Sequence, residues 1–269
     1  MELPEDIRNI SEITIEQAEM LMDKKINYVF IEDEYSYPEG RLYPPRAIIE
    51  YKKAIQEFLK GMPDFDRNVP DYEKRVFAYV YVKLALTVKY DTKAAKISSK
   101  PGYALDDEKG DYVNQAASLT GALINKRALC SGYAEALRNI LAEIGIKSKF
   151  ISGGRDVAGG GHAWNQVCLD GVWYNCDATN DADFFRKGLI APYFLVSNED
   201  YDLMREYPPR HKDVHVKTSA RSLYPDEQWK FTCAVLKLVK EEIKQAKKRP
   251  QYVTDIENKV SEKSSQKEG

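Results

Sequence analysis

The spacing of apolar and polar positions along this 269-residue chain predicts a mixture of helices and strands. Helical spacing predicts helices over residues 14–24, 44–62, 72–91, 111–125 and 226–248, and β-rich composition predicts a strand over 26–33. The segment 72–91 is apolar along most of its length, which favours a buried helix. The polar stretch 91–110 is interpreted as a long surface loop, and loops of that length commonly border a functional site.

Two β-rich runs, AWNQVCL (163–169) and VWYNCDA (172–178), flank the dipeptide Asp170-Gly171. This is the strongest short-range signal for a β-hairpin with a two-residue turn. In that register Leu169 faces Val172, and the alternation of a strand then places His162 and Asp177 on one face as diagonal neighbours. Such neighbours lie about 7–8 Å apart at Cα, so the carboxylate can orient the imidazole.

A cysteine precedes the best-marked helix of the chain. In LINKRALCSGYAEALRNILAEIGIKSKF (123–150), apolar residues recur at helical spacing after Cys130, Gly145 fits the position after the helix, and a strand follows. A helix N-terminus stabilises negative charge and therefore a thiolate. Taken alone, Cys130 fits equally well a small buried apolar residue, and a lone His162 fits a strand position with an incidental polar neighbour.

Together these residues form the set that acyl-transfer enzymes use: a nucleophile, a base and an acid that orients the base. The blocks ALINKRALCSGYAEALRNILAEIGI and GHAWNQVCLDGVWYNCDATND resemble the transglutaminase-like superfamily, as does the order Cys, His, Asp. Val172 is inserted here between the Gly and the Trp of the family pattern. The resemblance covers roughly residues 72–200. It implies that Cys130 is the nucleophile, His162 the base and Asp177 the orienting acid.

The resemblance also implies an α+β, cysteine-protease-like core, in which the nucleophile helix packs on an antiparallel sheet. We expect an N-terminal α/β extension over 1–70, the catalytic core over 71–218, a C-terminal helix over 219–250 and a disordered tail over 251–269. Besides the Cys130 backbone N–H, an oxyanion donor is required. Gln115, Asn125 and Trp164 are the candidates, and a structural role is favoured for each.

The implied reaction is attack of a thiolate on a protein or peptide amide, with a thioester intermediate. Hydrolysis, by a peptidase or deamidase, is slightly favoured over transamidation. The alternative is an inactive transglutaminase-like binding or scaffold module, whose partner surface would come from residues 1–70 and the C-terminal helix. The glycine-rich loop GGRDVAGGG (153–161) lacks a phosphate-loop pattern and leads into a strand, so nucleotide binding is disfavoured.

Composition limits the classes of partner and the location that we expect for this protein. Forty Lys and Arg nearly balance 42 Asp and Glu, so no overall field favours nucleic acid or a membrane surface. The acidic N-terminus is unlike a signal peptide and no long apolar run is present, so we expect a soluble cytoplasmic protein with a protein or peptide substrate. The basic residues at the end of the 226–248 helix are interpreted as a solvated helix end, with a partner-binding patch as the alternative.

The four cysteines match no zinc spacing, and no EF-hand loop is visible, so no metal or cofactor is expected. His211 and His215 lie four apart, as metal ligands on one helix would, but they follow two prolines and are interpreted as surface residues. The sequence makes no statement about oligomeric state.

Overall fold

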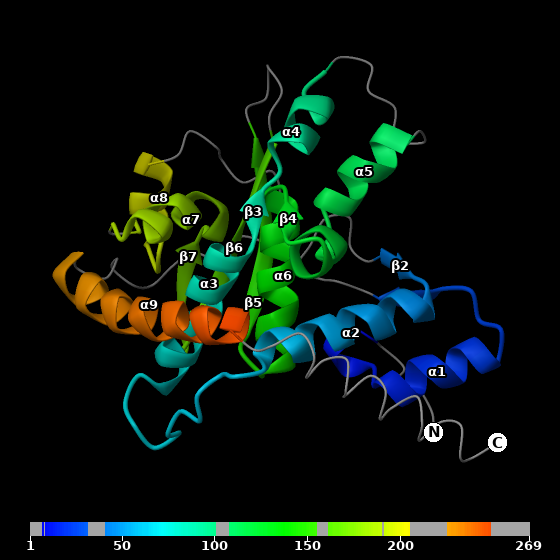
Figure 1. Cartoon of the computed structure of the whole chain (residues 1–269), viewed down its shortest axis with the longest axis horizontal. Coiled ribbons are helices and arrows are strands. Elements are labelled where there is room, and N and C mark those ends of the chain that lie inside the picture. Colours follow the sequence, from blue (N-terminus) through cyan, green and yellow to red (C-terminus); the bar gives the residue numbers. More distant parts are fainter. Residues whose placement is uncertain are drawn as a thin grey trace.

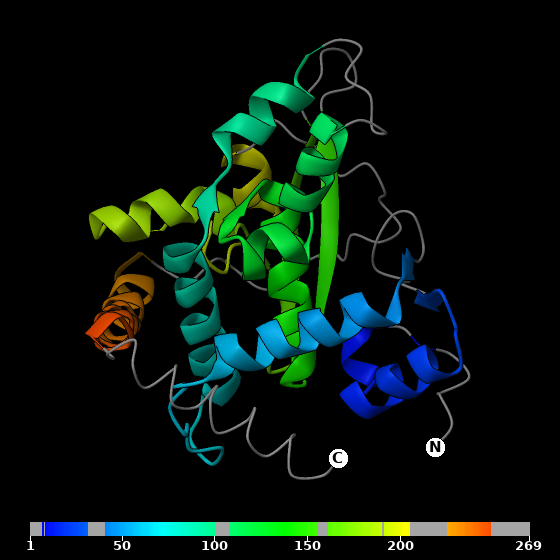
Figure 2. The same ribbon diagram turned by 45° about the vertical axis from the view of Figure 1, so that its right-hand side comes forward.

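The structure is a computed structural model, and it describes residues 7, 9–31, 41–100, 108–154, 161–189, 191–204 and 225–248. It combines helices with an antiparallel three-stranded sheet, which confirms the predicted α+β class. Helix α6 lies against this sheet near the centre of the molecule, and further helices surround the pair (Figures 1 and 2). Within the described residues, no helix has the length and apolarity that crossing a membrane requires.

The N-terminal part forms a small helical layer beside the lower end of α6 in Figure 1. Its elements are η1 (Ile10–Glu12), α1 (Ile15–Asp23), β1 (Val29–Ile31), β2 (Arg41–Tyr43) and α2 (Pro45–Leu59). Thr14 starts α1 with a reciprocal capping box to Gln17. The buried ammonium of Lys52 lies 3.1 Å from the Glu143 carboxylate at the end of α6. This ion pair ties the layer to the core.

Helix α3 (Tyr72–Thr87) is buried on almost every side, as its composition predicts, and every residue from 76 to 85 is shielded from solvent. It packs against α7 (Ala178–Lys187), α6 (Cys130–Glu143) and α9 (Pro225–Lys248). Leu236 and Val239 of α9 are buried, and Lys83 of α3 pairs with Glu242 at 2.7 Å. The side of α9 that carries Leu236 and Val239 is therefore its packing face.

The sheet has the order β5 (Ser148–Gly154), β6 (Gly161–Leu169) and β7 (Val172–Cys176), and every neighbouring pair is antiparallel. Leu169 pairs with Val172 across the turn, so the predicted hairpin register is confirmed. Asp170 and Gly171 both have positive φ, 51° and 79°, as a two-residue type I′ turn requires. The strand ends at Cys176, earlier than the sequence predicts.

The segment between α3 and α6 differs from its prediction. The stretch expected to be a loop from residue 91 contains α4 (Thr92–Ser98), because the Asp91 carboxylate caps that helix by accepting the N–H groups of Lys93 and Ala94. The helix expected over 111–125 is α5 (Glu108–Ala116), followed by a separate π-turn, η2 (Thr120–Ile124). Two short parallel strands, β3 (Lys89–Tyr90) and β4 (Arg127–Ala128), connect the segment to the start of α6.

Gly132, in the first turn of α6, allows the segment after α5 to approach the helix closely. A Cβ added there would lie 2.5 Å from the Ala116 carbonyl oxygen and 2.9 Å from Ala128 Cβ. We expect Gly132→Ala to lower the free energy of unfolding by about 1–3 kcal/mol, despite the better helix propensity of alanine. Chemical denaturation measures this, with Ser131→Ala as the control from the same turn. A Gly132→Ala protein as stable as the parent would contradict the close approach.

Helix α8 (Asn198–Met204) follows α7 and packs beside β7. The tail 251–269 and both His211 and His215 lie outside the described residues. The domain boundaries at residues 70, 218 and 250 remain predictions.

Candidate functional site

Cys130 is the first residue of α6, directly after Leu129, whose extended backbone begins the helix without a side-chain cap. The thiol is partly buried against Ala134, Phe150 and Ala163. Backbone N–H groups of the first turn of α6 lie next to the thiol, and no side chain caps them. The local environment therefore favours the thiolate form.

His162 lies near the start of β6, where it pairs with Gly153 of β5. Its side chain is 11% exposed, and its Nε2 lies 2.6 Å from Asp177 Oδ2. The imidazole also hydrogen bonds with the Cys130 thiol. Since Nε2 donates its proton to the carboxylate, we assign the thiol contact to Nδ1. The ring thus lies between the thiol and the acid.

Asp177 follows β7 and begins α7 as its N-cap residue, with no exposed surface. Its Oδ1 accepts the Asn180 backbone N–H at 3.1 Å. Its Oδ2 accepts hydrogen bonds from His162, from the Asn180 side-chain amide and, at 3.4 Å, from the Tyr201 hydroxyl. A buried carboxylate that meets several donors stays ionised, because these bonds replace the water it has lost.

The contacts among Cys130, His162 and Asp177 shift the pKa values of the thiol and the imidazole. Burial alone would lower the pKa of His162, but the Asp177 carboxylate and the contact with Cys130 outweigh it and raise that pKa to about 9. Burial alone would raise the pKa of the Cys130 thiol, but its hydrogen bond to His162, the imidazolium charge and the Ala163 N–H bring it below its ordinary value. Both shifts favour a thiolate–imidazolium pair near neutral pH.

Asn180 and Tyr201 belong to this site and were not predicted. Asn180 bonds to both oxygens of Asp177, and its side-chain nitrogen lies 3.3 Å from His162 Nε2. The one local signal is the Asp-x-x-Asn spacing, which is typical of a helix N-cap. Tyr201 reaches the site from α8, and nothing in the local sequence indicates this.

The three oxyanion candidates fall in different places. The Trp164 indole N–H donates to Asn175 Oδ1 at 3.2 Å, inside the buried face of the sheet. Gln115 and Asn125 are exposed, at the end of α5 and just after η2. The backbone donors next to the sulfur are the N–H of Cys130 itself and the N–H of Ala163, which contacts the thiol. Within the described residues, no cluster of three or more metal-ligating side chains comes together.

Part of the chain is similar to a known protein family. Residues 64–178, which contain all three predicted catalytic positions, match the family model of the transglutaminase-like superfamily. This part of the chain is therefore a transglutaminase-like domain. At the level of the family, it is related to cysteine-dependent enzymes, with no reaction specified.

Two solved structures show partial similarity. One is a TGase, 16% identical over 61% of this chain with a TM-score of 0.39. The other is a proposed cysteine protease from Cytophaga hutchinsonii, 14% identical over 48% of this chain with a TM-score of 0.31. The match covers 37% of the length of each of those chains. No curated protein matches this sequence.

Proposed function

We propose that this protein is a cysteine-dependent acyl-transfer enzyme that acts on protein or peptide amides, with Cys130 as nucleophile, His162 as base and Asp177 as orienting acid. The observation that carries the proposal is the position of His162, whose Nε2 is held 2.6 Å from buried Asp177 while the ring hydrogen bonds with the Cys130 thiol. A nucleophile, a base and an orienting group in hydrogen-bonding sequence is the arrangement that acyl transfer needs.

In the proposed reaction, the Cys130 thiolate attacks the amide carbonyl carbon and the carbonyl oxygen becomes an oxyanion. The Cys130 backbone N–H at the start of α6 stabilises that charge. The C–N bond then breaks, His162 gives its proton to the departing amine or ammonia, and a thioester remains. Neutral His162 next takes a proton from the acceptor, which attacks the thioester. The C–S bond breaks, the sulfur leaves as a thiolate, and the thiolate–imidazolium pair is restored. These groups complete the cycle without a metal or cofactor.

The acceptor decides the outcome, and we favour water slightly over an amine because the proposed location is the cytoplasm, where water is the default acceptor. Casein incubated with a fluorescent primary amine separates the possibilities. Transamidation attaches the amine to casein, whereas hydrolysis releases ammonia or peptide fragments and leaves the casein without the amine. No product of any kind would favour the alternative of an inactive binding or scaffold module.

The state of the thiol can be tested without a substrate. We expect iodoacetamide to alkylate Cys130 at a pH well below that needed by Cys168, whose pKa is raised by burial. The lowered pKa of Cys130 keeps thiolate present below the ordinary thiol range, which is near pKa 8.5, and His162 stays protonated up to about pH 9. Peptide mass spectrometry across pH 5–9 gives the rate at each cysteine.

The matched control is His162→Ala, which should return the Cys130 profile to higher pH while leaving Cys168 unchanged. If Cys130 and Cys168 titrate together in the native parent protein, no ion pair is present and the scaffold alternative is favoured.

A further inference from the structure

Helix α8 brings a tyrosine to His162 and Asp177 from outside the part of the chain that matches the family model. Tyr201 is 1% exposed, and the match ends at residue 178. Its hydroxyl donates to Asp177 Oδ2 at 3.4 Å, and its ring stacks on Trp164 with the centroids 5.0 Å apart. Trp164 in turn stacks on His162. One side chain therefore contacts both the acid and the ring that lies against the base.

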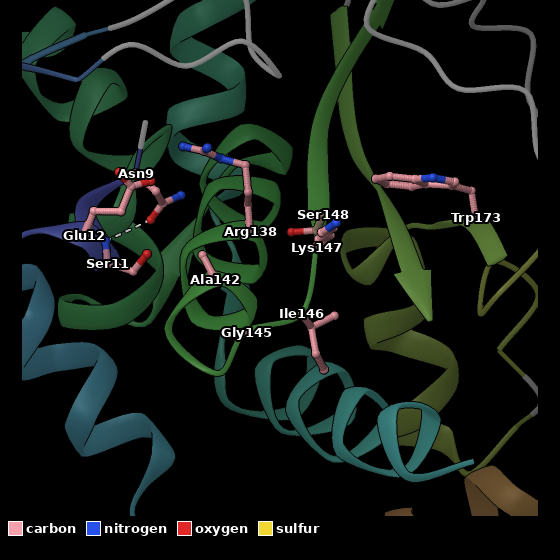
Figure 3. Close-up of a pocket in the computed structure, with 10 residues that line it drawn as sticks. All are labelled: Asn9, Ser11, Glu12, Arg138, Ala142, Gly145, Ile146, Lys147, Ser148 and Trp173. Atoms are coloured by element: carbon pink, nitrogen blue, oxygen red, sulfur yellow. Dashed lines mark hydrogen bonds between the residues drawn. The ribbon is translucent and has the colours of Figure 1, made fainter. Parts of the chain in front are cut away.

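Helix α8 is held on the sheet by side-chain amides. Figure 3 shows Trp173 on the side of the strands away from α6, and Asn175, two residues further along β7, points to the same side. Asn198 Oδ1, at the start of α8, accepts from Asn175 Nδ2 at 2.7 Å and from Gln166 Nε2 at 3.3 Å. The Oδ1 of Asn175 accepts the indole N–H of Trp164. The first residue of α8 is thus tied to both strands of the hairpin.

Further contacts fix the position of Tyr201 within the helix. Its backbone N–H donates to the Ser197 carbonyl oxygen at 3.0 Å, and Ser197 Oγ accepts the Asp200 N–H at 3.1 Å, as a helix cap does. Tyr193 meets the Tyr201 ring edge-on, with the centroids 5.9 Å apart. The hydroxyl therefore reaches Asp177 from a side chain whose ring is enclosed.

The tyrosine hydroxyl and the imidazole donate to the same atom. Asp177 Oδ2 accepts from His162 Nε2 at 2.6 Å and from the Tyr201 hydroxyl at 3.4 Å. Two donors on one carboxylate oxygen share its negative charge, so each reduces the effect of that charge on the other. The hydroxyl thereby moderates the attraction between Asp177 and the imidazolium.

We propose that Tyr201 is a positioning residue for His162 and Asp177, whose hydroxyl shares the Asp177 charge and whose ring holds the imidazole plane through Trp164. This inference rests on the roles proposed for His162 and Asp177 in acyl transfer. Tyr201 acts through these residues and forms no bond to the substrate.

The test is an NMR titration of the His162 ring in the full chain, with ¹³C-labelled histidine and with Cys130→Ala in every protein. The chain has three histidines, and His162→Ala identifies the signal from this site. Removing the thiol leaves Asp177 as the charged partner of the imidazole in this group. Tyr81 and Cys176 also face Asp177, and both are the same in every protein compared.

Two substitutions separate the hydroxyl from the ring. Tyr201→Phe removes only the hydroxyl, so the Asp177 charge acts on the imidazolium without a second donor, and the pKa of His162 should rise by about 0.5. Tyr201→Leu also removes the ring, so Trp164 loses its support and water reaches the carboxylate. Water screens the Asp177 charge, and the pKa of His162 should then fall below that of the Cys130→Ala reference.

The control is Tyr174→Phe, which removes a buried hydroxyl from β7 on the other face of the sheet and should leave the titration unchanged. Tyr201→Phe keeps the ring, so it decides the role of the hydroxyl even if Tyr201→Leu does not fold.

Three results would overturn the proposal. An unchanged pKa of His162 in Tyr201→Phe would show that the hydroxyl has no effect on the Asp177 charge. An equal rise in Tyr174→Phe would show a general effect of losing a hydroxyl. Equal values in Tyr201→Phe and Tyr201→Leu would remove the role of the ring. The expected shifts without any acyl-transfer product from the parent protein would support the role of Tyr201 and contradict only the proposed reaction.

Discussion

Cys130→Ala is expected to reduce acyl transfer to the uncatalysed background, a loss of about 10⁴-fold or more, because among the described residues no other group near His162 is able to form the thioester. The assay is release of ammonia, release of peptide fragments or incorporation of a fluorescent amine, whichever the parent protein shows with casein. The substitution removes only the sulfur of a partly buried side chain that caps no helix. Stability should therefore change by no more than about 1 kcal/mol.

Cys168→Ala is the matched control, since Cys168 is also partly buried and lies on β6 close to the hairpin turn. It should retain the parent activity. Activity that persists in Cys130→Ala with an unchanged melting temperature would exclude Cys130 as the nucleophile. Loss in both variants would point to a general effect on the fold.

Asp177→Asn is expected to lower kcat by about 10²- to 10⁴-fold, because an amide neither stabilises the imidazolium nor fixes the ring tautomer. The fold should survive, since asparagine also accepts the backbone N–H of Asn180 at the start of α7. The pKa of His162 is raised to about 9 mainly by the Asp177 charge, against burial that lowers it. Without that charge the pKa must fall.

The fall in the His162 pKa expected for Asp177→Asn moves the pH profile of activity in a defined direction. In the parent, activity that needs imidazolium is present below about pH 9 and declines as the pH rises through that value. In Asp177→Asn the decline should begin at lower pH, and a merely destabilised protein would not show such a displacement. Asp183→Asn is the control, because Asp183 is an exposed carboxylate of the same helix, paired with Arg186 at 2.8 Å. An Asp177→Asn profile with an unmoved alkaline limb would contradict the role proposed for Asp177.

Patterns in the local sequence were sufficient to predict the hairpin and the long helices α3 and α6. The Asp170-Gly171 turn and the alternation of β6 predict the observed pairing and bring His162 to the same face as Asp177. Gly145 has φ 79° just after α6, as its position in the sequence predicts. These features depend on residues close in the chain, which is why patterning recovers them.

The parts that patterning missed depend on distant contacts. Asp91 looks like an ordinary loop residue, yet it caps α4 and accepts a hydrogen bond from Tyr112 of α5 at 2.7 Å. Tyr201 reaches Asp177 only because α8 folds back beside β7. Asp177 itself was assigned to a strand, because the polar start of α7 carries no clear apolar stripe. The spacing of the residues predicted that Asp177 lies near His162. The N-cap geometry that holds Asp177 at the start of α7 is seen only in the structure.

The ring stack at the base of the site restricts the path of the reactants. Trp164 lies nearly parallel to His162, with ring centroids 6.1 Å apart and an interplanar angle of 13°, and Tyr201 stacks on Trp164 at 5.0 Å. One side of the imidazole therefore faces an aromatic column, while its Nε2 edge is held by Asp177. For the proposed reaction, the departing amine and the incoming acceptor therefore have to approach the imidazole from a side that this aromatic column does not cover.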